Sequence, residues 1–195
     1  MNKTRIEAFT DAVLAIIMTI MILEIHVPET PTLSGLFAEK YYFIAYLISF
    51  FYICTAWYYH HYVFSKIKWV SKRSFWANSF WLLCTSVIPV ATAWVSEFPQ
   101  ERIPEYTYFG TYILWAAAYY LLVTFLYRDN HLFKEKKESQ EFYTFMKRHG
   151  VIDLILVIGG LIGIYFFPLT GLIISALQVL LWMLFVPKDS DRLDY

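Results

Sequence analysis

Ionisable residues stand at both ends of a short apolar segment near the N-terminus. Arg5 and Asp11 precede twelve uncharged residues, AVLAIIMTIMIL, and Glu24 follows them. As a helix rising about 1.5 Å per residue, these twelve residues span roughly 18 Å, whereas the hydrocarbon core of a bilayer is about 30 Å thick. Charges at this depth are costly against lipid and acceptable beside protein or a water-filled cavity. The spacing therefore predicts an inner helix that lines a cavity or a pore, and the chemistry that it could serve is ion passage.

Two stripes of side chains run along this segment when it is drawn as a helix with 100° per residue. One stripe consists of Arg5, Ala12, Ile16, Thr19 and Leu23, with Phe9 and Ile20 at its edge. The other lies roughly 120° away and consists of Asp11, Ala15, Met18 and Ile22. If the Asp11 stripe faces the other helices of the subunit, the Ile16 stripe can face a central axis. Several copies would then form a hydrophobic constriction with a ring of threonine oxygens. A packed core is the alternative interpretation of such an aliphatic stripe.

Adjacent histidines near the end of the second apolar segment are the other ionisable candidates. His60 and His61 could bind a metal ion or respond to pH near neutrality. No Asp, Glu or Cys follows them at ligand spacing on that segment, so we expect no metal site and a hydrogen-bonding role for His60. Because neighbouring residues of a helix point in different directions, only one of the two can lie on the face of His60.

The composition is typical of a membrane protein. Of the 195 residues, 58% are hydrophobic, 21% aromatic and 16% charged, whereas a soluble domain has about 25% charged residues. The formal net charge is zero, which provides no basic field for a nucleic acid. Cys54 and Cys84 lie inside apolar segments, where we expect reduced packing residues.

Six apolar segments are expected to span the membrane within a single all-helical domain that covers residues 1–195. The expected spans are residues 5–25, 41–64, 75–95, 106–127, 151–167 and 169–186. Asp153 lies at the start of the fifth span, where we expect the dipole of a helix N-terminus to favour it. Close helix packing is expected at the small residues of that span, Gly159, Gly160 and Gly163.

Lysine and arginine are distributed unequally between the two sides of these spans. Fourteen lie in the N-terminus, the second and fourth connections and the C-terminus, whereas the opposite side holds only Lys40 and Arg102. The positive-inside rule therefore places both termini in the cytoplasm. Within the fourth connection, residues 134–147 mix both signs of charge with aromatic residues, which predicts a surface amphipathic helix or a solvated helical linker.

The first three spans resemble a known family. The segment from Arg5 to Asp11 is similar to the RxxxFSD signature of the transmembrane protein 175 family of potassium channels, with Thr10 in place of the serine. The likeness covers the whole first helix, residues 5–25, and the six-span layout also fits. Further matches lie in the second and third spans, at Trp57, His60, His61, Phe64, Asn78 and residues 86–92.

The resemblance implies a homotetramer in which the first helix of each subunit lines the pore. It places the narrow hydrophobic ring at Ile16, with Thr19, Ile20 and Leu23 further out. It also implies that the signature holds the pore helix by polar contacts to the second and third helices. The residues given this role are Arg5, Phe9, Thr10 and Asp11, with His60 and Asn78 as partners.

These expectations describe a potassium-preferring cation channel of the cell membrane. Its constriction would be made of side chains, because the chain lacks the TVGYG carbonyl filter. The permeant ion would be K⁺ and the partners would be other copies of the chain and the lipid bilayer. We expect no cofactor, no nucleic acid and no small-molecule substrate.

Two other classes of function compete with a channel. A secondary transporter of a cation or small solute is the alternative, and it would need broken helices and coupling carboxylates near the midplane. Asp11 and Glu24 lie at the ends of their segment instead. An intramembrane enzyme would need a nucleophile beside a base, and the sequence offers no clear partner for His60 or His61, so we expect no catalysis.

Overall fold

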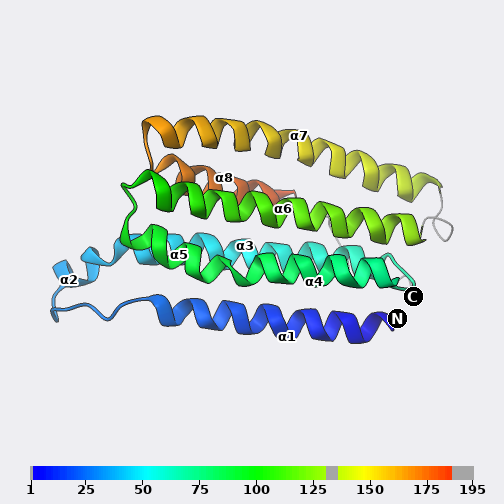
Figure 1. Ribbon diagram of the computed structural model, residues 1–195, viewed down its shortest axis with the longest axis horizontal. Helices are drawn as coiled ribbons and strands as arrows, with labels where there is room; N and C mark the ends of the chain where they lie inside the picture. The colour runs from blue at the N-terminus through cyan, green and yellow to red at the C-terminus, as the bar shows by residue number, and fades with distance from the viewer. Residues whose placement is uncertain (1, 131–135, 186–195) are drawn as a thin grey trace.

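The computed structural model describes residues 2–130 and 136–185, with the side chains of residues 136–149 outside this description. The described residues form an all-helical bundle whose long helices lie side by side (Figure 1). Among the described residues, four segments are long and apolar enough to cross a membrane, namely Lys3–Glu24, Lys40–Ser65, Lys72–Glu97 and Arg102–Asn130. Two shorter apolar helical segments follow, at Gly150–Phe166 and Thr170–Leu184.

The elements agree with the expected spans in order and differ from them in extent. The first span is α1 (Lys3–Met21), which ends in a 3-10 turn, η1 (Ile22–Glu24). A short helix that was not expected, α2 (Leu33–Ala38), lies in the first connection. The other helices are α3 (Lys40–Ser65), α4 (Lys72–Ser86), α5 (Ile88–Glu97), α6 (Arg102–Asn130), α7 (Lys136–Phe166) and α8 (Thr170–Leu184).

The third expected span, residues 75–95, is interrupted. The helix α4 ends at Ser86 and α5 begins at Ile88, with Pro89 in its first turn. Proline has no N–H, and its ring clashes with the carbonyl four residues earlier, so the helical ladder breaks at this point. The two pieces follow one another along one segment, Lys72–Glu97, which is long and apolar enough to cross a membrane (Figure 1).

The fifth expected span, residues 151–167, is only the second half of a longer helix. Because α7 begins at Lys136, Asp153 lies in the middle of that helix and not in its first turn. Its carboxylate accepts hydrogen bonds from Trp182 Nε1 at 3.0 Å and from the Tyr120 hydroxyl at 3.2 Å. The Asp153 carboxylate is therefore stabilised by neutral hydrogen-bond donors from α6 and α8, and not by the dipole of a helix N-terminus as was expected. The side chains expected to form a surface helix over residues 134–147 lie outside the described residues.

Buried hydroxyl groups join α3, α5 and α6. Tyr112 donates a hydrogen bond to Ser49 at 2.8 Å, and Ser49 is also 2.8 Å from Thr92 and 3.0 Å from the hydroxyl of Tyr108. Because each polar atom inside an apolar bundle is costly unless it is paired, this cluster favours one relative position of the three helices.

Glycines bring α7 close to α6 and α8. A Cβ atom at Gly160 would meet the buried ring of Phe109, and one at Gly163 would meet Thr170. At Gly159, in contrast, the nearest neighbour of an added Cβ is the end of Ile174, at 4.0 Å. The small residues of this segment are therefore not equivalent, and only some of them permit close packing.

Replacing Gly160 with alanine should destabilise the fold by about 1–3 kcal/mol, because the buried ring of Phe109 cannot move aside. Gly159→Ala is the matched control, and it should be neutral or slightly stabilising because alanine favours the helix. Thermal unfolding of the purified variants in detergent measures both effects. Equal melting temperatures for the two variants would contradict the described packing.

Candidate functional site

One face of α1 is buried against the rest of the bundle. Ile6, Thr10, Leu14, Ile17 and Met21 recur every three or four residues and are all buried. They face α3, α4 and α5, while α1 itself lies at one edge of the bundle (Figure 1). The stripe that faces the other helices is therefore the one that contains Thr10, and the supposition that the Asp11 stripe faces them is not met, because Asp11 and Ile22 are exposed.

A chain of hydrogen bonds fixes this buried face. The amide nitrogen of Asn78, on α4, donates to the hydroxyl of Thr10 at 2.8 Å. The amide oxygen of Asn78 lies 3.0 Å from Nε2 of His60, on α3, which donates to it in the tautomer protonated at that nitrogen. All three side chains are buried. The chain therefore joins α1, α4 and α3 through polar atoms that have no access to water.

Aromatic rings hold His60 in its orientation. Its ring stacks on that of Phe64, with centroids 4.1 Å apart, and lies nearly parallel to that of Trp81, with centroids 5.3 Å apart. Because the imidazole packs against two aromatic rings and is hydrogen-bonded to the amide of Asn78, we interpret His60 as a structural hydrogen-bond donor. Among the described residues, no group of three or more His, Cys, Asp or Glu side chains could hold a metal ion.

Asp11 makes a separate contact with α3. Its carboxylate accepts a hydrogen bond from Nε1 of Trp57 at 2.8 Å, and the indole of Trp57 stacks on the ring of His61. Asp11 itself remains exposed. The two adjacent histidines therefore make different contacts. His60 is hydrogen-bonded to Asn78, in the chain that contains Thr10, whereas His61 stacks on Trp57.

The opposite face of α1 is exposed and mostly apolar. The exposed fraction is 57% for Ile16 and 42% for Ile20, and Thr19 between them is exposed as well. Leu23 is 78% exposed, but it lies in η1, where the regular helical spacing no longer applies. The four residues expected to line a pore are therefore all on the surface of this single chain.

Two signature residues make none of the expected contacts within one chain. Arg5 is exposed and, in the part of the chain that the structure describes, has no carboxylate within ion-pair distance. Phe9 is 49% exposed. The structure therefore brings Thr10 together with His60 and Asn78, brings Asp11 to Trp57, and leaves Arg5 and Phe9 on the surface.

The hydroxyl of Thr19 is already committed as a donor. It gives its hydrogen to the carbonyl oxygen of Ile16 at 2.9 Å. A hydroxyl has one donor hydrogen and two acceptor lone pairs, so the lone pairs stay available on the exposed side. This arrangement suits coordination of a cation and does not suit donation to an anion.

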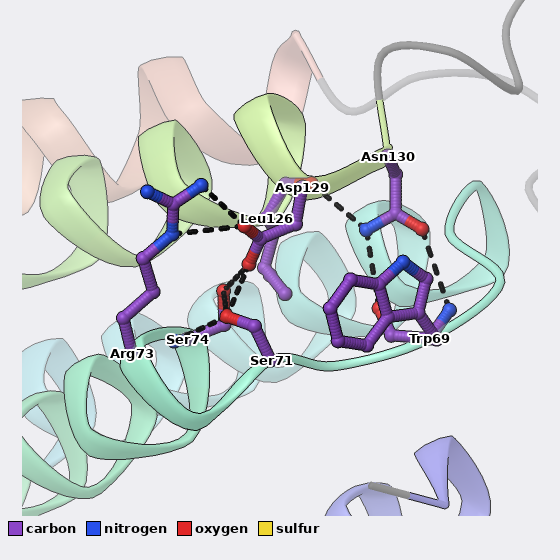
Figure 2. Close-up of polar contacts among 7 residues, drawn as sticks. All are labelled: Trp69, Ser71, Arg73, Ser74, Leu126, Asp129 and Asn130. Atoms are coloured by element: carbon purple, nitrogen blue, oxygen red, sulfur yellow. Dashed lines mark hydrogen bonds and ion pairs between the residues drawn. The ribbon is translucent and has the colours of Figure 1, made fainter.

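Polar groups at the far end of α6 were not expected from the sequence. Asp129 and Asn130 bind the segment that connects α3 with α4 (Figure 2). Glu105, at the opposite end of α6, was not expected either: it is buried and accepts a hydrogen bond from the backbone N–H of Leu172 at 3.1 Å, in the first turn of α8. An ionisable residue near the end of an apolar span was the only signal for either contact.

Comparison with known proteins identifies a matching family and similar sequences. A family model described as the endosomal/lysosomal potassium channel TMEM175 matches residues 5–89. A protein of Chryseobacterium sp. (strain P1-3), named a potassium channel, is 34% identical over 187 residues and is covered to 94%, as is this chain. A protein of Streptomyces collinus with the same designation is 32% identical, covering 71% of this chain and 72% of that protein.

A similar fold has also been solved. The crystal structure of a lysosomal potassium-selective channel TMEM175 homolog from Chamaesiphon minutus matches with a TM-score of 0.77. The match covers 93% of this chain and 96% of that one, at 24% sequence identity. At this identity the likeness concerns the fold.

Thr10→Val should destabilise the protein by about 1–3 kcal/mol, because it leaves the buried amide of Asn78 without an acceptor while keeping the shape of the side chain. Thr10→Ser is the matched control: it retains the hydroxyl and should change stability little. Unfolding of both variants in detergent provides the comparison. If valine and serine gave the same stability, the hydrogen-bonded chain would not be what holds α1.

Proposed function

We propose that this chain, which belongs to the TMEM175 family of potassium channels, forms a potassium-preferring cation pore lined by α1 of each subunit. The observation that carries the proposal is the unequal burial of α1. One face is fixed to the bundle through Thr10, while the other exposes Ile16, Thr19 and Ile20. Channels are not a class of enzyme, and we assign the chain no catalytic activity.

The exposed face of α1 supports assembly around a central axis. A helix with Arg5 and Asp11 near one end is costly against lipid and acceptable beside water or protein. We therefore place α1 at the centre of a homotetramer, with six spans per subunit within residues 1–195 and lipid around the outer helices. The distribution of lysine and arginine supports a cell-membrane location with both termini in the cytoplasm.

In the proposed constriction, side chains determine which ions pass. A ring of Ile16 from four subunits would make a narrow apolar passage that conducts only when it is wetted. Thr19 follows one turn further, and its free lone pairs offer oxygen to a partly dehydrated cation. Ile20 and Leu23 would widen the passage beyond it. K⁺ is then the permeant ion, and the protein needs no resident cofactor.

A secondary transporter has one feature in its favour, the interrupted helix between α4 and α5. The residues around this break, 86–92, contain no ionisable side chain, so coupling carboxylates are missing there. A recording of the purified protein in a planar bilayer distinguishes the two functions. Currents above about 10⁶ ions per second support a channel, whereas turnover near 1–10³ per second supports a carrier.

Thr19→Ala should lower the permeability ratio of K⁺ to Na⁺ by about two-fold or more, since one oxygen contact contributes roughly 0.5–1.5 kcal/mol. Reversal potentials under bi-ionic conditions measure the ratio. Thr111→Ala is the matched control, because Thr111 also donates to its own helix, at Thr107, but lies on α6. An unchanged K⁺ to Na⁺ permeability ratio in Thr19→Ala would show that Thr19 does not contribute to selectivity.

Ile16→Asn should increase single-channel current, because a polar side chain at the narrowest ring favours water in the constriction. Ile22→Asn is the control, since Ile22 is also exposed but lies beyond the end of α1, in η1. Recordings in symmetrical potassium solutions compare the two. Equal currents in the two variants would place the narrow ring elsewhere.

A further inference from the structure

The segment that connects α3 with α4 and the first turns of α4 expose basic and aromatic side chains together. Lys66, Lys68 and Lys72 are exposed, as are Trp69, to 42%, and Trp76, to 62%. The segment follows the end of one span and opens the next, so it lies at the level where a bilayer meets water. Residues 66–76 contain no acidic side chain.

Buried side chains and hydrogen bonds from α6 hold this connection against the bundle. Ile67 and Val70 are buried and alternate with the exposed residues. The amide oxygen of Asn130 accepts hydrogen bonds from the backbone N–H groups of Lys68, at 3.0 Å, and Trp69, at 3.3 Å. Its amide nitrogen donates to the carbonyl of Trp69 at 3.1 Å (Figure 2). One side chain of α6 thus fixes the backbone in the middle of the connection.

Asp129 anchors the start of α4 in the same way. Its carboxylate accepts hydrogen bonds from the hydroxyls of Ser71 and Ser74 and from the guanidinium of Arg73 (Figure 2). Ser71 is also the N-cap of α4, since its hydroxyl accepts from the N–H of Ser74. The carboxylate of Asp129 is therefore already bound to Arg73 and two hydroxyls.

The anchored segment thus presents a surface that carries positive charge and is flanked by indole rings. Indole rings favour the headgroup level of a bilayer, and lysines at this level attract anionic lipids by about 1 kcal/mol each. A merely solvated loop would not need both Asp129 and Asn130 to hold it. Apolar anchors at Ile67 and Val70 direct the lysines outward and not into the bundle.

We propose that residues 66–76, which form the connection and the first turns of α4, bind the phosphate groups of anionic phospholipids in the leaflet that they face. The ammonium groups of Lys66 and Lys72 would contact phosphate oxygens, and Trp69 and Trp76 would lie among the headgroups. This site is separate from the pore proposed for α1, and its occupation does not depend on which ion is conducted.

The test measures lipid retained by the purified full-length protein in detergent, using native mass spectrometry. Phosphatidylglycerol and phosphatidylcholine with identical acyl chains are added in equal amounts. The unmodified protein should retain more phosphatidylglycerol. The double variant Lys66→Gln/Lys72→Gln should lose this preference by about five-fold or more, the factor that one basic residue near an anionic surface contributes.

The matched control is Lys40→Gln/Arg102→Gln, which removes two positive charges from the opposite end of the bundle. It should keep the preference. Retention of the preference in Lys66→Gln/Lys72→Gln, or an equal loss in the control, would overturn the proposal. Inorganic phosphate has the same oxygens without acyl chains and should not displace the lipid; displacement would overturn the assignment to a membrane ligand.

Asp129→Ala separates a fixed site from simple charge attraction. This change raises the net charge by one and removes the acceptor for Ser71, Arg73 and Ser74. If the held conformation makes the site, retention of phosphatidylglycerol should fall despite the added positive charge. A rise in retention would overturn the role of the anchored connection.

Discussion

The hydrogen-bonded chain from Thr10 through Asn78 to His60 decides how α1 is rotated. Buried polar groups are costly unless they are paired, so this chain resists any turn of the helix about its axis. Thr19 lies nine residues after Thr10, which at 100° per residue places it on about the opposite side of the helix. The same contact that buries Thr10 therefore exposes Thr19, and it fixes Ile16 beside it.

The rest of the bundle is built to keep that contact in place. Buried hydroxyls at Ser49 and Tyr112 position α3 against α6, and the anchors from Asp129 and Asn130 hold the start of α4 against the end of α6. Since α3 carries His60 and α4 carries Asn78, the two partners that hold Thr10 in this chain are themselves supported by contacts that do not involve α1. The contacts that orient α1 are therefore separate from its exposed face.

Sequence patterns were sufficient for the broad features and insufficient for the contacts between helices. Apolar length predicted an all-helical membrane protein, and the motif at Thr10 pointed to the family. Pro89 is the sequence signal for the break at Val87, which the length of the apolar run alone does not indicate. The contacts of Asp153 and Asp129 could not be predicted, because helices that are apolar on every side carry no periodic signal for their rotation. Their partners are set by packing between segments far apart in the chain.

The central claim is that α1 faces a water-filled passage at Ile16, and modification of a cysteine tests it most directly. The variant Ile16→Cys is recorded in a planar bilayer while a charged, membrane-impermeant thiol reagent is added. Our account predicts that the reagent stops or strongly reduces the current of this variant and leaves the unmodified protein unaffected, although Cys54 and Cys84 are present. Current that persists unchanged in Ile16→Cys would contradict the account.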